Sequence, residues 1–367
     1  MSAPRPNSTF GDGNVDRLIS EVLGLVGEDG NDDLVRKLVV TALEMDEADV
    51  GRLELKIASQ ALAEMLNAYK VFSQHRERAK VTVFGSARTA PDHPDFVIAR
   101  DFSRIMAERD WMTISGAGPG IMTAAIEGAG VENSFGVSIV LPFEAKAADI
   151  IDGDPKLAIF RYFFTRKLFF MKETDAFALF PGGFGTLDET FELLTLIQTG
   201  KAYPAPIVLL DHPESGYWNA WQRFVDEGLA ANGMIKADDT DLYLHTHDPE
   251  EAADYLCAFY ATFHSIRYVG KRLLVRMNRA LDGDAIETLN DEFGDIVVSG
   301  RIEPTEATAA ERRDDDHVDL ARLGFRFDDR SFARLTQMIH RMNELGGPQS
   351  PAAHRGLVHD LDPEPDD

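Results

Sequence analysis

The sequence predicts an α/β protein whose central part is a doubly wound parallel sheet. Three observations lead to this prediction. Short β-rich apolar runs alternate with helical stretches between residues 81 and 264, glycine-rich turns follow three of these runs, and the pattern changes on both sides of the region. Apolar strands that alternate with helices are typical of parallel pairing, with helices on both faces of the sheet.

Six strands and six helices are expected in this central region. The strands are Val81–Phe84, Met112–Ser115, Val137–Leu141, Ala176–Phe180, Ile207–Leu210 and Leu242–Leu244. The helices are expected over residues 95–109, 119–129, 157–173, 187–199, 217–230 and 249–264. Residues 78–265 are therefore interpreted as one Rossmann-like domain with right-handed crossovers. Ligands of such domains bind beyond the carboxyl ends of the strands.

The N-terminal part, residues 1–77, is expected to be a helical extension whose first 13 residues are disordered. Helical periodicity runs through residues 14–75. An apolar stripe is formed by Leu62, Met65, Leu66 and Tyr69, which follow each other at the spacing of one helix face. We expect the neighbouring domain or a second subunit to cover this stripe.

The C-terminal part, residues 266–345, is expected to be a small α+β domain. Strands are predicted at Arg272–Met277, Ile296–Ile302 and Leu320–Phe327. Helices are predicted over Asp284–Phe293 and from a Ser331 cap to Leu345. The acidic tail, residues 346–367, is rich in proline, glycine and aspartate and is expected to be disordered.

Composition restricts the classes of partner and the compartment. Lys and Arg total 37 against 62 Asp and Glu, a formal charge of −25, so nucleic acid is not an expected partner. The one cysteine, Cys257, is expected to be a buried thiol in an apolar helix, and a single cysteine cannot form a disulfide within the chain. A signal peptide and a membrane-spanning run are not expected either. These features predict a soluble cytoplasmic protein.

Glycine-rich turns are predicted to form the functional site. They are Gly85-Ser86-Ala87-Arg88, Ser115-Gly116-Ala117-Gly118-Pro119-Gly120 and Pro181-Gly182-Gly183-Phe184-Gly185-Thr186. Each lies where an expected strand passes into a helix. Backbone N–H groups at such a junction favour an anion, and glycine lets the backbone approach it closely. Three turns at one edge of a sheet indicate a shared phosphate-binding crevice.

Two common nucleotide motifs do not fit these turns. Gly116, Gly118 and Gly120 are spaced G-x-G-x-G and not G-x-G-x-x-G, and the next strand is not followed by the acid that a dinucleotide ribose requires. A P-loop is excluded because the chain has no G-K-[ST]. The remaining interpretation is a site for a monophosphate or nucleotide.

Glu189 has two interpretations. Thr186 and Glu189 match a capping box, in which the glutamate returns a hydrogen bond to the helix cap. Alternatively, the carboxylate faces the ligand bound at the same helix start. There it stabilises an oxocarbenium-like state or activates water during N-glycosidic hydrolysis.

Two other groups of residues also allow both a structural and a functional interpretation. Arg166 and Lys167 lie in an otherwise apolar and aromatic stretch, so they either extend to solvent or act on a substrate and its phosphate. His245 and His247 precede an ordinary Asp-Pro helix start, and a metal site there needs more ligands than the local sequence offers. No metal is therefore expected.

Taken together, these residues resemble the LOG family of cytokinin riboside 5′-monophosphate phosphoribohydrolases, some of which carry the older label of possible lysine decarboxylases. Pro181–Glu189 matches the family signature P-G-G-x-G-T-x-x-E, and an Arg-Lys pair precedes it by the family spacing at Arg166-Lys167. The resemblance covers roughly residues 80–230. One departure is Phe170, where the family has a methionine; Met171 is its neighbour.

The resemblance implies a nucleoside 5′-monophosphate N-glycosidase, acting on AMP or an N6-modified AMP without metal or organic cofactor. Arg166 and Glu189 would be catalytic. The substrate would be bound by Gly85, Ser86, Gly116, Gly118, Gly120, Lys167, Gly182, Gly183, Gly185, Thr186 and Thr195. A homodimer or higher homo-oligomer is implied. Two alternatives stay open: a non-catalytic nucleotide sensor or carrier, and an amino-acid decarboxylase, for which the chain offers no distinctive Schiff-base lysine.

Overall fold

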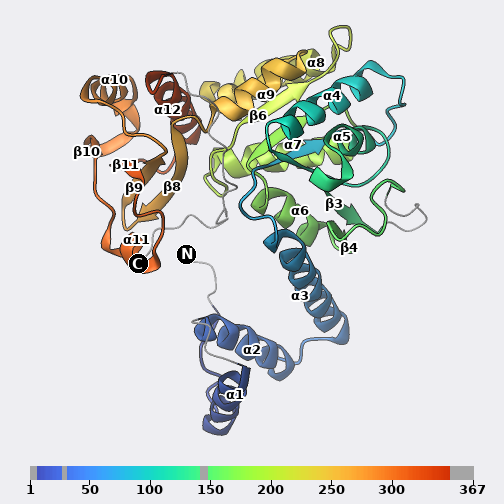
Figure 1. Ribbon diagram of the computed structural model, residues 1–367. Helices are drawn as coiled ribbons and strands as arrows, with labels where there is room; N and C mark the ends of the chain where they lie inside the picture. The colour runs from blue at the N-terminus through green and yellow to red at the C-terminus, as the bar shows by residue number, and fades with distance from the viewer. Residues whose placement is uncertain (1–5, 27–30, 141–147, 348–367) are drawn as a thin grey trace. The chain divides into compact units, whose positions relative to one another are not determined.

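The computed structural model describes residues 6–26, 31–140 and 148–347 and divides into two compact units, residues 1–65 and 66–367 (Figure 1). The disorder predicted for residues 1–5 and 348–367 concerns segments outside the described residues. Residues 6–12 contain no helix or strand, and the first helix begins at Gly13.

The first unit is helical, as predicted. It holds α1 (Gly13–Val26), α2 (Asp32–Glu47) and most of α3 (Arg52–Ser73). In the predicted apolar stripe on α3, Leu62 and Leu66 are exposed, and Tyr69 lies against Phe169, with ring centroids 5.1 Å apart. That the neighbouring domain or a second subunit covers the stripe stays a prediction. Farther along α3, Phe72 is buried and stacks on Phe135, with ring centroids 4.5 Å apart. The buried face of this part of α3 thus differs from the predicted stripe.

A seven-stranded parallel sheet forms the centre of the second unit and confirms the predicted fold class. Its strand order is β4-β3-β2-β1-β5-β6-β7. The strands are β1 (Lys80–Phe84), β2 (Met112–Ser115), β3 (Ser134–Ile139), β4 (Leu157–Phe160), β5 (Ala176–Leu179), β6 (Ile207–Leu210) and β7 (Tyr243–Thr246). From β1 the chain moves outward to β4, then returns to the other side of β1 with β5. The β1–β5 pair is therefore the topological switch point, where doubly wound folds bind ligands.

Helices lie on both faces of this sheet (Figure 1). They are α4 (Pro94–Glu108), α5 (Ile121–Ala129), α6 (Phe163–Lys172), α7 (Phe184–Gln198), α8 (Tyr217–Arg223) and α9 (Pro249–Ala258). Short 3-10 turns occur at Val131–Asn133, Ala237–Leu242 and Gly294–Ile296.

Three predicted helices have a different structure over part of their length. The helix expected over residues 157–173 was wrong in its first part, because residues 157–160 form strand β4 beside β3. The helix expected over 217–230 is α8 followed by a π-helical segment, Phe224–Ala230. The helix expected over 249–264 ends at Ala258, since a strand that the sequence did not reveal begins at Phe263.

The C-terminal region contains an antiparallel sheet with the order β10-β11-β9-β8. Its elements are β8 (Phe263–Val269), β9 (Arg272–Met277), α10 (Gly283–Phe293), β10 (Val297–Pro304), α11 (Ala309–Asp314), β11 (Ala321–Phe327) and α12 (Phe332–Leu345). The predicted domain boundary at residue 266 falls inside β8. That residues 266–345 fold independently stays a prediction. Ser331 precedes α12, but its hydroxyl bonds Asp328 (2.7 Å) and makes no side-chain cap.

The two sheets share one apolar core. Phe259, Tyr260 and Phe263 are buried at their junction, and the Tyr260 hydroxyl donates a hydrogen bond to the carbonyl of Asp175 beside β5 (2.7 Å). Cys257 is a free, partly buried thiol packed against this core. Among the described helices, none combines the length and the apolar character that a membrane crossing requires.

Candidate active site

The three glycine turns meet at the carboxyl edge of the parallel sheet. They follow β1, β2 and β5, which are neighbours in the strand order. The backbone N–H of Ser86 donates to the carbonyl of Pro181 (3.0 Å), and the N–H of Ile121 donates to the carbonyl of Ser86 (3.1 Å). The first turn is thus hydrogen-bonded to the third turn and to the residue that directly follows the second, so the three turns lie together as expected from the sequence.

Glycine is required where these turns touch. Gly120 has φ +68°, a conformation that disfavours other residues, and a Cβ there would collide with the carbonyl oxygen of Ser86. At Gly85 a Cβ would come within 2.6 Å of the Ile121 side chain. In the third turn, a Cβ at Gly182 would collide with Thr186. These glycines hold the turns at backbone-contact distance.

Helix α7 begins at Phe184, inside the third glycine-rich segment, and this start excludes the capping-box interpretation of Glu189. The N-cap residue is Gly183, so Thr186 lies inside the first turn of the helix and Glu189 lies farther inside. No side chain caps this helix start, where Gly183, Phe184 and Gly185 are exposed. The first N–H groups of a helix have no intrahelical acceptor. The start of α7 is therefore an open donor site for an anion.

Arg166, on α6, is held close to Glu189. Its Nε donates to the carbonyl of Val137 within β3 (2.9 Å), and its guanidinium carbon lies 4.9 Å from the centroid of the Phe170 ring. Nη1 of Arg166 lies 4.0 Å from Oε1 of Glu189, with side-chain exposures of 11% and 8%. This separation exceeds a hydrogen bond. The two charges face each other without closing into a bonded pair.

Burial shifts the pKa values of both side chains in this pair. Burial raises the pKa of Glu189, and the charge of Arg166 only partly opposes that rise. Burial also lowers the pKa of the Arg166 guanidinium, which Glu189 partly offsets. Oppositely charged groups with shifted pKa values are typical of catalytic sites and also occur in structural ion pairs.

The other predicted binding residues differ in their placement. Lys167 is bound to two carboxylates of α7, Asp188 and Glu192, each at 2.8 Å. Burial would lower the pKa of Lys167, but its hydrogen bonds with these carboxylates outweigh burial and raise it. Thr195 is exposed on α7, eleven residues after Phe184 and so about 16 Å along the helix axis. The structure does not bring Thr195 to the glycine turns.

Gly116 and Gly118, in the turn after β2, lie against Met122, and Gly116 also faces Arg166. A Cβ at Gly116 would come within 2.6 Å of Nη2 of Arg166 and 2.7 Å of Sδ of Met122, whereas one at Gly118 would meet only Met122. The smallness of Gly116 therefore leaves room for the arginine.

Sequence reasoning missed three contacts that shape this site. The Tyr217 hydroxyl donates to the carbonyl of Gly182 (2.7 Å) and tethers the third turn to α8. The carbonyl of Val137 orients Arg166. Phe170 is fully buried beneath the guanidinium, and Met171 is buried next to it. The sequence carried a signal only for Phe170, as the departure from the family methionine.

Histidine clusters accompany this edge of the sheet. Asp211, after β6, lies within 3.0 Å of ring nitrogens of both His245 and His247, so the structure supplies a third group where the sequence showed two. A second group combines His93 and Asp95, at the start of α4, with His212. These are the described groups whose residue types suit a metal ion.

Comparison with known proteins matches the central part of the chain. The family model described as "Possible lysine decarboxylase" matches residues 120–256, less than half of the chain. The probable cytokinin riboside 5′-monophosphate phosphoribohydrolase LOGL1 of Oryza sativa subsp. japonica is 40% identical over 73 residues, 20% of this chain and 31% of that protein. Probable LOG4 of the same plant is 29% identical over 163 residues, 43% of this chain and 67% of that protein.

The chain spans less than half the length of the first curated relatives that it matches. Among solved structures, the molybdenum cofactor carrier protein of Chlamydomonas reinhardtii is 20% identical, with 48% of this chain and 94% of that chain covered and a TM-score of 0.34. DNA processing protein A of Helicobacter pylori is 11% identical, with 50% and 81% covered and a TM-score of 0.36. The matched family agrees with the resemblance carried by Pro181–Glu189.

Proposed function

We propose that this chain, a relative of the LOG family, hydrolyses the N-glycosidic bond of a purine nucleoside 5′-monophosphate. AMP or an N6-modified AMP would yield the free base and ribose 5-phosphate. The observation that supports this most is the buried pair of Arg166 and Glu189, which lie 4.0 Å apart beside the glycine turns. The relatives' names support the same reaction class.

The substrate phosphate would bind at the start of α7. Free N–H groups and the helix dipole favour an anion there, even though the protein as a whole is strongly acidic. Lys167 is already paired with Asp188 and Glu192, so we assign the main phosphate contacts to the backbone of Gly183–Thr186. The exposed position of Thr195 gives it no direct role in this proposal.

The spacing along α7 suits a nucleotide. Glu189 follows Phe184 by five residues, about 7.5 Å along the helix axis. A phosphate at the helix start would therefore leave the sugar, and not the phosphate, beside the Glu189 carboxylate. N-glycosidic cleavage develops positive charge at C1′ of the ribose, which a carboxylate in a water-poor crevice stabilises. Glu189 can also take a proton from the attacking water.

Arg166 would act on the other side of the bond. Its guanidinium is fixed by Val137 and Phe170, so it is pre-organised to orient the substrate and stabilise charge on the departing base. The same positive charge opposes the rise in the pKa of Glu189 that burial causes. The proposed mechanism thus uses both residues, and neither needs a metal or organic cofactor for these steps.

A product assay tests the proposed function. Purified protein is incubated with AMP, GMP, CMP and isopentenyl-AMP, and free base and ribose 5-phosphate are quantified by chromatography. We expect base and sugar phosphate in equal amounts from at least one purine monophosphate. Nucleotide binding without turnover would favour the sensor or carrier alternative. A pyridoxal-type absorbance band in the purified protein would favour the decarboxylase alternative.

The activity is expected to fall in acid with a midpoint above the ordinary pKa of glutamate. Glu189 acts as a carboxylate, and its folded-state pKa is raised, so protonation removes activity at a higher pH than for an exposed glutamate. Arg166→Met removes the charge that opposes this rise, so the acid limb should move to still higher pH. The profile of kcat/KM for the free enzyme measures this limb.

The substrate phosphate itself titrates near pH 6, as phosphate monoesters do, and this contributes equally to both proteins. The measured quantity is therefore the difference in acid midpoint between the unmodified protein and Arg166→Met. An unchanged or lower midpoint in Arg166→Met would contradict the coupling of these residues. The homodimer implied by the family resemblance also stays a prediction, and the mass of the purified protein in solution tests it.

A further inference from the structure

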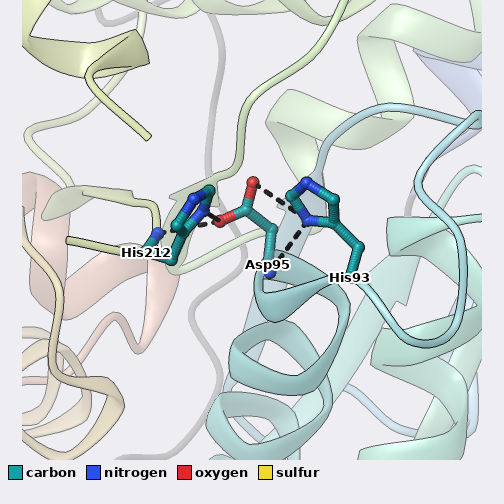
Figure 2. A group of neighbouring side chains, drawn as sticks. All are labelled: His93, Asp95 and His212. Carbon is teal, nitrogen blue, oxygen red and sulfur yellow. Dashed lines mark hydrogen bonds and ion pairs between the residues drawn. The ribbon is translucent and has the colours of Figure 1, made fainter. Parts of the chain in front are cut away.

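We propose that His93, Asp95 and His212 bind one divalent transition-metal ion of the zinc class. Figure 2 shows the two imidazole rings on either side of the Asp95 carboxylate. One ligand atom from each residue lies within 4.8 Å of the others. His93 and Asp95 are neighbours at the start of one helix, His212 is distant in the sequence, and none of the three belongs to the proposed catalytic pair.

The fold brings these residues together at the carboxyl edge of the parallel sheet. His93 is the N-cap residue of α4, at the end of the loop that begins with Gly85 and Ser86, and Asp95 lies in the first turn of that helix. His212 comes two residues after β6. A bound ion would therefore join the loop after β1 to the loop after β6.

The contact between His93 and Asp95 places an unprotonated ring nitrogen near a carboxylate oxygen. Nδ1 of His93 carries no proton, because it accepts a hydrogen bond from the backbone N–H of Asp95 (3.2 Å), and an ion bound at Nδ1 would replace that hydrogen bond. The same Nδ1 lies 3.6 Å from Oδ2 of Asp95, an oxygen that carries negative charge when the acid is ionised. Two electron-rich atoms thus face each other, an arrangement that a metal ion between them would stabilise.

The remaining contacts complete a three-ligand set. Nδ1 of His212 lies 2.9 Å from Oδ1 of Asp95, and the backbone N–H of His212 donates to the same oxygen (2.8 Å). The Asp95 side chain is 5% exposed, so its charge has little water to stabilise it. The His93 side chain is 44% exposed, which leaves a path for the ion and a place for a water ligand.

The residue types identify the class of metal. Two imidazoles and one carboxylate suit zinc and similar transition metals, whereas magnesium and calcium prefer oxygen ligands. Bonds of about 2.0–2.2 Å in a tetrahedral shell put ligand atoms roughly 3.3 Å apart. The pairs at 2.9 and 3.6 Å are close to that value, but they end on different oxygens of Asp95. The carboxylate would therefore bind the ion through both oxygens or turn so that one oxygen faces both rings.

The neighbouring group of Asp211, His245 and His247 provides a comparison. Here both ring nitrogens lie at hydrogen-bond distance from Oδ1 of Asp211, at 2.9 and 3.0 Å, and His247 also reaches the Asp211 carbonyl (2.9 Å). With N–H groups on these nitrogens, the imidazoles can hydrogen-bond this fully buried carboxylate without a cation, whereas the 3.6 Å between Nδ1 of His93 and Oδ2 of Asp95 is too long for a hydrogen bond. We therefore assign the ion to the His93 group and use His245 as the matched control.

Zinc titration of the tag-free, full-length protein tests this assignment. After removal of metal with EDTA, ZnCl2 binding is measured by calorimetry, and CoCl2 binding by visible absorption. We expect one ion per chain at this site. His93→Asn and His212→Ala should each weaken binding by at least about 10–100-fold, the range known for supporting residues of metal sites. His93→Asn keeps a good helix cap, so folding should be preserved.

His245→Ala should bind zinc like the unmodified protein. Circular dichroism shows whether each variant is folded, and a misfolded variant is replaced by His93→Ser, which also caps a helix. The assignment is overturned if the unmodified protein does not bind zinc or cobalt. It is equally overturned if His245→Ala abolishes binding while His93→Asn retains it.

Discussion

Glu189→Gln is expected to lower kcat for nucleoside monophosphate cleavage by about 10²–10⁴-fold, the contribution typical of a positioned acid-base group. The substitution keeps the size of the side chain and removes only its ability to carry negative charge and accept a proton. Because the buried carboxylate has a raised pKa, it is costly to ionise, and a neutral amide should not destabilise the fold. The measurement is single-turnover product release, alongside thermal unfolding.

Glu127→Gln is the matched control, since Glu127 is an exposed glutamate on α5. This variant should keep the unmodified rate. A folded Glu189→Gln variant with near-normal turnover would remove Glu189 from the mechanism. It would leave the crevice as a nucleotide-binding site whose chemistry lies elsewhere.

Gly116→Ala should lower kcat by about 10²-fold, because a displacement of roughly 1 Å at a catalytic group costs that much. Its Cβ would lie 2.6 Å from Nη2 of Arg166. The arginine cannot easily move aside, since Val137 holds its Nε and Phe170 packs beneath it. The same crowding should reduce the free energy of unfolding by about 1–3 kcal/mol. Steady-state kinetics and denaturant unfolding measure the two effects.

Gly118→Ala separates crowding of the arginine from general crowding of the turn. Its Cβ would meet only the flexible end of Met122, at 2.7 Å from Cε. We expect a clearly smaller loss of kcat than for Gly116→Ala. Equal losses in the two variants would mean that the turn after β2, and not the position of Arg166, determines the rate.

The sequence predicted the parallel sheet because its buried strands are short apolar runs between glycine turns. The run Leu157–Phe160 was misassigned to a helix, since four apolar residues followed by a helical stretch do not show a change of period. Pairing with β3 decides its conformation. β8 was missed for a related reason, because it follows α9 after only a short turn.

The candidate site was predictable where its residues lie close in sequence, and less so where it depends on long-range packing. Thr186 and Glu189 have the spacing of a capping box, but α7 starts earlier, at Phe184, because Gly183 takes the N-cap position. The ion pairs of Lys167 join two helices whose facing side the sequence does not reveal. The group around Asp95 likewise exists only after the loops following β1 and β6 meet.

The central claim is that a phosphate bound at the start of α7 places a glycosidic bond between Arg166 and Glu189. Comparing AMP with adenosine as substrates tests it most directly, with adenine release measured for both at the same enzyme concentration. The account predicts adenine and ribose 5-phosphate from AMP in equal amounts, and a kcat/KM for adenosine at least about 100-fold lower, as expected when a charge-assisted anchor worth roughly 3 kcal/mol is removed. No adenine from AMP, or equal cleavage of adenosine, would contradict it.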